Sequence, residues 1–334
     1  MKSAKTMVVM FTLMMLAVSG IMPIQASDGM AKVGLMMWIG NEAFIEEMTR
    51  LGYVEGQNIS YFALNYADLK PEDFQNGFKT QLQMMVDSQI DVLVTNTDSD
   101  AVYYRETLGT IPMVFARSDD PVATGAVADL IKPGGFTTGI ITNKPHERRL
   151  QILTEIKPNT KKVYYLYSTL TADAEPVLKQ VQSVAQSLNV EIIPGALTDP
   201  QSIGTVLDNM PEDIDWIFLT PYVYLDEPSL QKLMDLSNAR QAGLCYFVDS
   251  VPPGYVMGYG PSLDDTARQA ARIVDRILRG GNPAELPVEI AENYLTINLE
   301  AAQVINLAVP EATLRQANLI IRPGYFDPTP TPGN

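Results

Sequence analysis

The chain has 334 residues, an apolar share of 46% and a formal net charge of −15 at pH 7. Its length predicts about two domains, and its apolar content is far too high for a disordered chain. A protein this acidic is a poor partner for nucleic acid or anionic lipid, so we expect neither as a partner, and we expect a soluble monomer.

The first 26 residues have the pattern of a secretory signal peptide. Lys2 and Lys5 supply a positive start, the 16 residues from Met7 to Met22 carry no charge, and Ala26 precedes the predicted cut. An uncleaved anchor is the alternative, although 16 residues fall just short of a membrane span. No cysteine follows this run to carry a lipid anchor. The sequence therefore predicts a periplasmic or otherwise secreted protein.

Apolar runs alternate with helical patterns along the first half of the mature chain. Strands are predicted at 32–37, 59–64, 91–95, 111–115 and 138–141. Helices are predicted at 42–51, 71–88, 98–108 and 122–131, and the last of them ends at the helix-stopping segment KPGG, residues 132–135.

The same alternation starts again after a break near Thr142 and Asn143. Helices are predicted at 145–156, 174–188, 201–209, 227–241, 262–279 and 299–306. Strands are predicted at 163–167, 190–193, 215–219, 243–248, 255–258, 295–298 and 319–321. Ser262 is expected to cap the long helix that follows it.

The strands are continuous apolar runs, which is typical of parallel sheets covered by helices on both faces. The two series predict an α/β protein with two doubly wound parallel-sheet domains. Ligands of such sheets bind beyond the carboxyl ends of the strands. The loops at those ends come from both halves of the chain, so we expect the ligand in a cleft between the domains. These loops are 38–41, 96–100, 117–120, 168–173, 220–225 and 249–253.

Few residues indicate catalysis or metal binding. The only histidine, His146, stands with Glu147 at a helix start, where a surface position is expected, and one histidine cannot build a histidine-rich metal site. The only cysteine, Cys245, lies in the apolar run GLCYFV and is expected to be a buried, inert thiol. The sequence has no G-x-S-x-G, P-loop or G-x-G-x-x-G motif. We therefore expect no enzyme, no metal and no cofactor.

Four segments, in order, resemble one protein family. They are LGYVEGQNI (51–59), IPMVFARSDDPVATG (111–125), KPGGFTTGI (132–140) and YLTINLEAAQVINLAVPEATLRQANLII (294–321). Together they are similar to the periplasmic substrate-binding proteins of the ABC uptake family that includes tryptophan- and tyrosine-binding members. The resemblance implies a type I periplasmic-binding fold, in which two lobes joined by a three-segment hinge close on a ligand.

The resemblance also implies lobe boundaries. The first lobe would span 31–142 plus 253–287, and the second would span 143–252 plus 288–325. The chain would return to the first lobe near Pro252–Gly254 and cross finally near Val288–Glu292. Residues 326–334 form a proline-rich tail that is expected to be disordered.

The function implied is solute capture. The protein would bind a small molecule, an aromatic amino acid being favoured, and deliver it to an ABC permease and ATPase in the inner membrane. The alternative is the ligand-binding module of a sensory or receptor system, since both kinds of protein share the fold.

An amino acid needs hydrogen-bond donors for its carboxylate and an acidic group for its ammonium. Hydroxyls of the strand-end loops, several of them near helix N-termini, suit the carboxylate. The candidates are Thr97, Ser99, Ser118, Ser168 and Thr169. Asp249 falls where the resemblance places an acidic ligand contact, so it is expected to hold the ammonium; the alternative is an aspartate that caps its own turn.

Three aromatic residues are candidate walls for an aromatic ligand. They are Trp38, Tyr222 and Tyr224. Tyr222 and Tyr224 lie two residues apart after a strand, so one is expected to face the cleft and the other the core.

Arg117 departs from the family pattern, since relatives tend to have small or neutral residues at this point. Its guanidinium would either clamp a ligand carboxylate bidentately or pair with Asp119 or Asp120. Asp119 is a candidate ligand contact as well. Asp120, which precedes Pro121, is expected to set the turn and cap the helix that follows.

Overall fold

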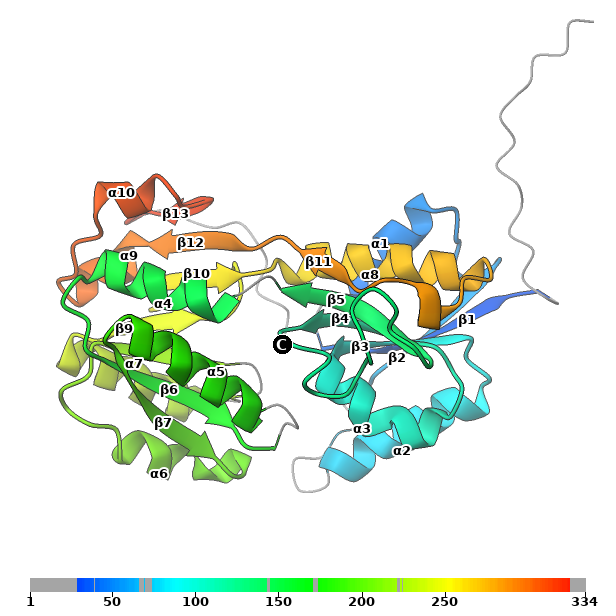
Figure 1. The fold of residues 1–334 in the computed structure, drawn as a ribbon, viewed down its shortest axis with the longest axis horizontal. Coiled ribbons are helices and arrows are strands. Elements are labelled where there is room, and N and C mark those ends of the chain that lie inside the picture. Colours follow the sequence, from blue (N-terminus) through cyan, green and yellow to red (C-terminus); the bar gives the residue numbers. More distant parts are fainter. Residues whose placement is uncertain are drawn as a thin grey trace, which may run out of the picture.

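The computed structural model describes residues 29–38, 40–65, 69, 74–142, 145–170, 174–220, 223 and 225–324. The predicted signal peptide and the predicted disordered tail lie outside these residues. Two sheets form two lobes that lie side by side, and helices cover both faces of each sheet (Figure 1). The predicted α/β architecture with two parallel-sheet lobes is therefore confirmed.

The first lobe contains a six-stranded parallel sheet in the order β11-β5-β4-β3-β1-β2. Its strands are β1 (Ala31–Met36), β2 (Ile59–Ala63), β3 (Val92–Thr97), β4 (Met113–Ser118), β5 (Thr137–Thr142) and β11 (Glu289–Ala291). Its helices are α1 (Asn41–Arg50), α2 (Phe74–Asp87), α3 (Asp98–Leu108) and α8 (Leu263–Leu278). Helices α1 and α8 pack on one face and α2 and α3 on the other.

The second lobe contains a seven-stranded sheet in the order β13-β12-β10-β9-β8-β6-β7, in which only β10 and β12 pair antiparallel. Its strands are β6 (Lys162–Ser168), β7 (Glu191–Leu197), β8 (Trp216–Leu219), β9 (Gly243–Tyr246), β10 (Met257–Gly260), β12 (Tyr294–Asn298) and β13 (Leu319–Ile321). Its helices are α4 (Pro145–Ile156), α5 (Ala174–Ser187), α6 (Ile203–Asp208), α7 (Glu227–Arg240), α9 (Leu299–Val304) and α10 (Glu311–Leu314).

The lobe boundaries differ from the predicted ones. The apolar run that was expected to lead back to the first lobe instead forms β10, which pairs with β9 through Met257 opposite Cys245 and so stays in the second sheet. The chain crosses only after Gly260, so the crossing predicted near 252–254 is wrong. β11 pairs with β5, which places the final crossing at 292–293, at the end of the predicted range.

The helix predicted at 122–131 is also wrong, because the segment forms a series of turns. The Asp120 carboxylate accepts the N–H of Ala123 at 3.0 Å, as predicted for a turn-setting aspartate, but the chain then leaves the helical path. Gly125 has φ of 77°, a left-handed conformation that interrupts a helix. Two residues further on, Val127 donates its N–H back to the carbonyl of Pro121 at 3.1 Å.

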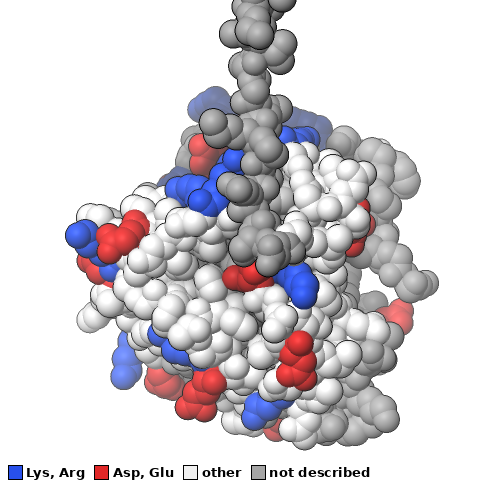
Figure 2. All heavy atoms as spheres, turned by 90° about the vertical axis from the view of Figure 1, so that its right-hand side faces the viewer, with Lys and Arg blue, Asp and Glu red and all other residues white. Residues whose placement is uncertain are grey.

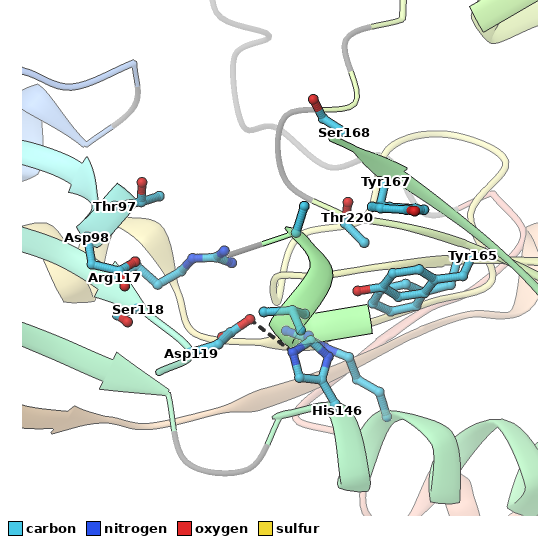
Figure 3. Close-up of a pocket in the computed structure, with 14 residues that line it drawn as sticks. Thr97, Asp98, Arg117, Ser118, Asp119, His146, Tyr165, Tyr167, Ser168 and Thr220 are labelled. Carbon is cyan, nitrogen blue, oxygen red and sulfur yellow. Dashed lines mark ion pairs between the residues drawn. The ribbon is translucent and has the colours of Figure 1, made fainter. Parts of the chain in front are cut away.

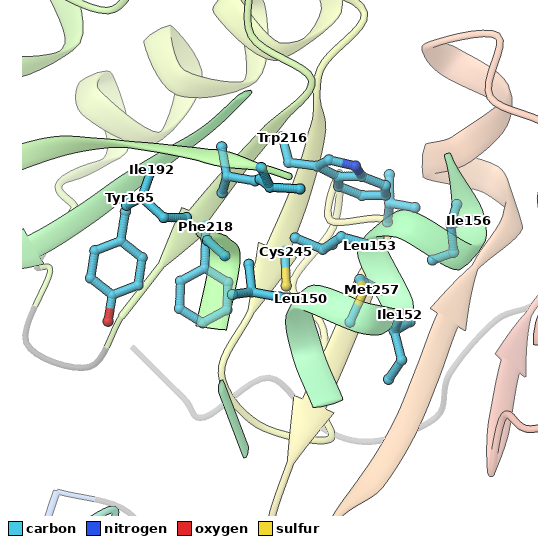
Figure 4. Close-up of a cluster of buried hydrophobic side chains, with 14 of the residues drawn as sticks. Leu150, Ile152, Leu153, Ile156, Tyr165, Ile192, Trp216, Phe218, Cys245 and Met257 are labelled. Carbon is cyan, nitrogen blue, oxygen red and sulfur yellow. The ribbon is translucent and has the colours of Figure 1, made fainter. Parts of the chain in front are cut away.

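A large aromatic residue anchors the core of the second lobe. Trp216 is fully buried among the apolar side chains of α4 and the sheet (Figure 4), and its Nε1 donates to the hydroxyl of Thr160 at 3.0 Å. The ring lies so close to the neighbouring strand that a Cβ on Gly243 would be 2.2 Å from Cζ3 of Trp216. Cys245 is buried in the same cluster, as predicted.

Acidic and basic side chains are interspersed on the face of the first lobe shown in Figure 2. Ion pairs also join α1 to α8 in this lobe, for example Arg272 with Glu47 at 3.0 Å. Among the residues that the structure describes, no helix is both long enough and apolar enough to span a bilayer.

Candidate ligand-binding site between the lobes

A pocket lies where the carboxyl ends of strands from the two sheets meet (Figure 3). The first lobe contributes Thr97, Asp98, Arg117, Ser118 and Asp119. The second contributes His146, Arg149, Tyr165, Tyr167, Ser168, Ala174, Val177, Phe218 and Thr220. The cavity volume is about 40 Å³, far below the roughly 300–1,000 Å³ of a typical ligand pocket. We therefore expect a ligand to enter only when the lobes separate.

Arg117 reaches from the end of β4 toward the second lobe (Figure 3), and only 7% of it is exposed. Its guanidinium lies over the ring of Phe247, which belongs to the second lobe, 5.2 Å from the ring centroid. Among the described residues it forms no ion pair with Asp119 or Asp120, and its Nη1 has no hydrogen-bond partner. The neighbouring Ser118 hydroxyl is also buried and has no hydrogen-bond partner in the described part of the chain. Arg117 thus acts on Asp119 through its charge alone, and both alternatives for Arg117 stay predictions.

Asp119 links the two lobes through His146. Its Oδ2 lies 3.1 Å from Nε2 of His146, and its Oδ1 accepts a hydrogen bond from the Thr142 hydroxyl at 2.5 Å. Burial acts to raise the pKa of Asp119, but His146, Arg117 and Arg149 outweigh it and hold that pKa well below its usual range. The carboxylate therefore stays ionised at neutral pH.

The surface position predicted for His146 is wrong, since only 5% of it is exposed. The first turn of α4 lies at the lobe junction, and residues three apart on a helix share a face. His146 and Arg149 therefore both face the pocket. The sequence carried a signal for this: Arg149 interrupts the otherwise apolar stripe of the helix, beside Ile152 and Leu153.

Arg149 joins the residue after β9 to strand β10. Its Nε donates to the carbonyl of Tyr259 at 2.6 Å and its Nη2 to the carbonyl of Phe247 at 2.7 Å. The guanidinium also lies 5.5 Å from the ring centroid of Phe218. Burial lowers the pKa of Arg149, and Asp119 opposes that shift. This arginine is thus occupied by the backbone of its own lobe.

Aromatic side chains of the second lobe form one wall of the pocket. The rings of Tyr165 and Phe218 are stacked, with centroids 5.3 Å apart and an interplanar angle of 1°. The ring centroids of Tyr167 and Tyr165 are 5.9 Å apart. Both rings lie on the same face of β6, because alternate residues of a strand point to one side. Sequence reasoning placed the aromatic wall elsewhere, although the alternation in VYYLY indicates this pair.

Five predicted ligand contacts line the pocket: Thr97, Arg117, Ser118, Asp119 and Ser168. The side chain of Thr97 also takes part in the capping box of α3, with Asp100. Ser99 is buried in α3 outside the lining, and Thr169 is exposed, with its hydroxyl donating to the carbonyl of Leu197 at 3.1 Å. Contact of any of these residues with a ligand stays a prediction.

Two further candidates lie away from the pocket lining. Trp38 is 43% exposed and packs on Phe78, with ring centroids 5.3 Å apart. The carboxylate of Asp249 accepts the N–H of Ser250 at 2.8 Å, which matches the self-capping alternative. Tyr222 and Tyr224 lie outside the described residues, so their predicted roles are untested.

No metal centre is evident in the part of the chain that the structure describes, since no three His, Cys, Asp or Glu side chains come together to hold an ion. The pocket instead combines charged donors, hydroxyls and stacked aromatic rings. Such a lining suits a small organic molecule with a polar end and a flat apolar body.

The sequence profile of a family described as "ABC transporter substrate binding protein" matches residues 41–321. The chain belongs to this family. Its members bind solutes, so the expectation that this protein is not an enzyme is confirmed.

Three relatives illustrate the likeness of this substrate-binding protein to known proteins. A tyrosine-binding protein of Clostridioides difficile (strain R20291) is 20% identical over 268 residues, which cover 80% of this chain and 76% of the relative. An ABC domain from Streptococcus pneumonia in complex with L-Trp has a TM-score of 0.75 at 19% identity, covering 86% of this chain and 100% of that one. A conserved domain protein from Vibrio cholerae has a TM-score of 0.74 at 23% identity, covering 87% and 99%.

Proposed function

We propose that this substrate-binding protein captures an amino acid between its lobes, preferably an aromatic one, and delivers it to an ABC permease and ATPase. One observation carries the proposal: buried donors of the first lobe, Arg117 and Ser118, face a stacked aromatic wall of the second lobe. The names of the tyrosine-binding relative and of the L-Trp complex support the same ligand class.

The two sides of the pocket match the two ends of an aromatic amino acid. A carboxylate gains most from a charged donor in a water-poor site, because such hydrogen bonds are about twice as strong as neutral ones. An aromatic ring gains from stacking on Tyr165 and Phe218. A ligand held at both ends contacts both lobes, so its binding stabilises the closed arrangement of the hinge.

The place of action follows from the family and from the predicted signal peptide. A solute-binding protein serves an importer only from outside the inner membrane, where the solute arrives. We therefore propose that residues 1–26 direct export and are cleaved, and that the mature chain works in the periplasm or an equivalent extracytoplasmic space.

A thermal-shift screen of the mature chain tests the ligand class. At about 100 times Kd, a ligand that binds only the folded state adds roughly 2.7 kcal/mol of stability, which raises the melting temperature by several degrees. We expect this shift with tyrosine, tryptophan or phenylalanine and none with glycerol or other polyols. A shift with polyols alone would reject the amino-acid class.

Delivery needs its own experiment. The permease and the ATPase encoded by neighbouring genes would be purified and reconstituted in liposomes. ATP hydrolysis would then be measured with this protein and its ligand. We expect stimulation only when both are present. Tight binding without stimulation, together with a neighbouring sensor gene, would favour the sensory alternative.

A further inference from the structure

Two buried donors of the first lobe lack acceptors. Nη1 of Arg117 and Oγ of Ser118 are without hydrogen-bond partners among the described residues, and both residues are more than nine-tenths buried at the pocket. A buried charged donor without an acceptor is unfavourable, because its hydration is lost and nothing replaces it. The closed site is therefore incomplete until an acceptor arrives.

The second arginine of the pocket shows that a buried arginine here does not necessarily lack acceptors. The missing acceptor of Arg117 therefore depends on its position. Arg149 is also buried and lines the same pocket, yet it donates to two backbone carbonyls, those of Tyr259 and Phe247. To the residues that the structure describes, Arg117 makes no comparable hydrogen bond, and it lies over the ring of Phe247. Of these two arginines, Arg117 is the one suited to a ligand.

The carboxylates of the pocket, unlike these two donors, have partners within the protein. Asp98 accepts a hydrogen bond from the Thr124 hydroxyl at 2.7 Å. Asp119 accepts one from Thr142 at 2.5 Å and pairs with His146 at 3.1 Å. Both lining carboxylates thus have partners within the protein, so the described lining is better equipped for an anionic group of the ligand than for a cationic one.

We propose that the site recognises its ligand chiefly by a carboxylate, which Arg117 and Ser118 of the first lobe hold while Tyr165 and Phe218 of the second hold an aromatic ring. The α-amino group contributes little to affinity. The ligand class is then aromatic carboxylates, of which aromatic amino acids are one kind. This inference rests on the function proposed above and narrows it.

The arrangement gives each lobe a separate task. Arg117 and Ser118 end β4, whereas Tyr165 and Phe218 lie on β6 and β8 across the junction. A ligand lacking either end would contact one lobe only, and it would lose the closure that contact with both lobes brings.

Titration calorimetry with three matched probes tests the inference. L-Tyrosine carries both charged groups, 3-(4-hydroxyphenyl)propionate lacks the amine, and tyramine lacks the carboxylate. We expect the propionate to bind within about fivefold of tyrosine, and tyramine to bind at least roughly tenfold more weakly, the loss expected for one charged hydrogen bond. Tyramine binding as tightly as tyrosine would overturn the inference.

Two variants and a control locate the carboxylate. Arg117→Gln should weaken tyrosine and the propionate at least about tenfold and leave tyramine unchanged. Ser118→Ala, a nearly isosteric change that keeps the fold, should weaken the same two probes by a smaller factor. Arg315→Gln, which alters an exposed arginine paired with Glu311 far from the pocket lining, should change none of the three affinities. Equal losses for all three probes in Arg117→Gln would show a structural role instead.

The outcomes separate the two proposals. If the propionate binds and no amino acid does, the amino-acid function fails and the carboxylate inference stands. If tyrosine and tyramine bind equally, the function stands and the inference fails. If folded protein binds none of the three probes, both are overturned.

Discussion

Replacing Asp119 by asparagine removes the charge at the centre of the lobe junction. Asparagine can still accept the hydrogen bond of Thr142, but the negative charge 3.1 Å from Nε2 of His146 is lost, and with it a buried counter-charge of Arg117 and Arg149. Breaking a buried ion pair on one side costs about 3–5 kcal/mol. At the lower limit, a chain of about 300 folded residues should melt about 5 °C lower.

The pH dependence gives this prediction its sign. The pKa of Asp119 in the folded chain lies well below the unfolded value of about 3.9, so its contribution is complete above that value and is lost as pH falls through the folded pKa. Thermal unfolding of ligand-free protein, followed by circular dichroism from pH 7 to pH 3, should show a constant gap between wild type and Asp119→Asn down to about pH 4. The exposed control Asp235→Asn should stay within about 0.5 kcal/mol of wild type. A gap that closes between pH 7 and pH 5 would refute the reasoning.

Three further predictions concern single sites. Burial raises the pKa of Asp249 to about 6, so wild-type stability should fall relative to Asp249→Asn as pH rises from about 4 to 7; melting curves that stay parallel across this range would contradict it. Gly243→Ala should destabilise by about 1–3 kcal/mol because its Cβ would meet the ring of Trp216, whereas Gly204→Ala, with no atom nearby, should stabilise by up to about 1 kcal/mol in urea unfolding. Burial raises the pKa of the Cys245 thiol to about 12, so Ellman's reagent should react with it only after unfolding.

Most of the fold could be predicted because the local sequence determines where most of its helices and strands lie. The helix α8 shows why: apolar positions recur at steps of three and four from Ala267 to Ile277, and the Ser262 hydroxyl accepts the N–H of Asp265 as an N-cap. The failures arose where distant pairing decides. The run that becomes β10 has no local feature that assigns it to one sheet, and only its pairing with β9 and β12 keeps it in the second lobe.

The site was harder to predict, because the rule on strand ends gives an edge of a sheet but no position along it. Trp38 does follow a strand, yet β1 lies one strand beyond β3 and β4, whose ends line the pocket. Arg117, Ser118 and Asp119 end or follow β4 itself, and they line the pocket. Nothing local to either residue could pair Asp119 with His146, since the two meet only through the geometry of the hinge.

The charges at the lobe junction explain how ligand capture and closure are joined in an otherwise acidic protein. Arg149 is satisfied by its own lobe, and the Asp119 carboxylate is shared among Thr142, His146 and the fields of both arginines. When the lobes are closed and the site is empty, Arg117 is therefore buried without a full counter-charge. The lost hydration of its guanidinium destabilises the closed state by about 1–3 kcal/mol. A ligand carboxylate removes this cost as it binds. Such a difference shifts the balance between open and closed lobes by roughly five- to 150-fold, so the ligand acts as the counter-ion that completes the closed state.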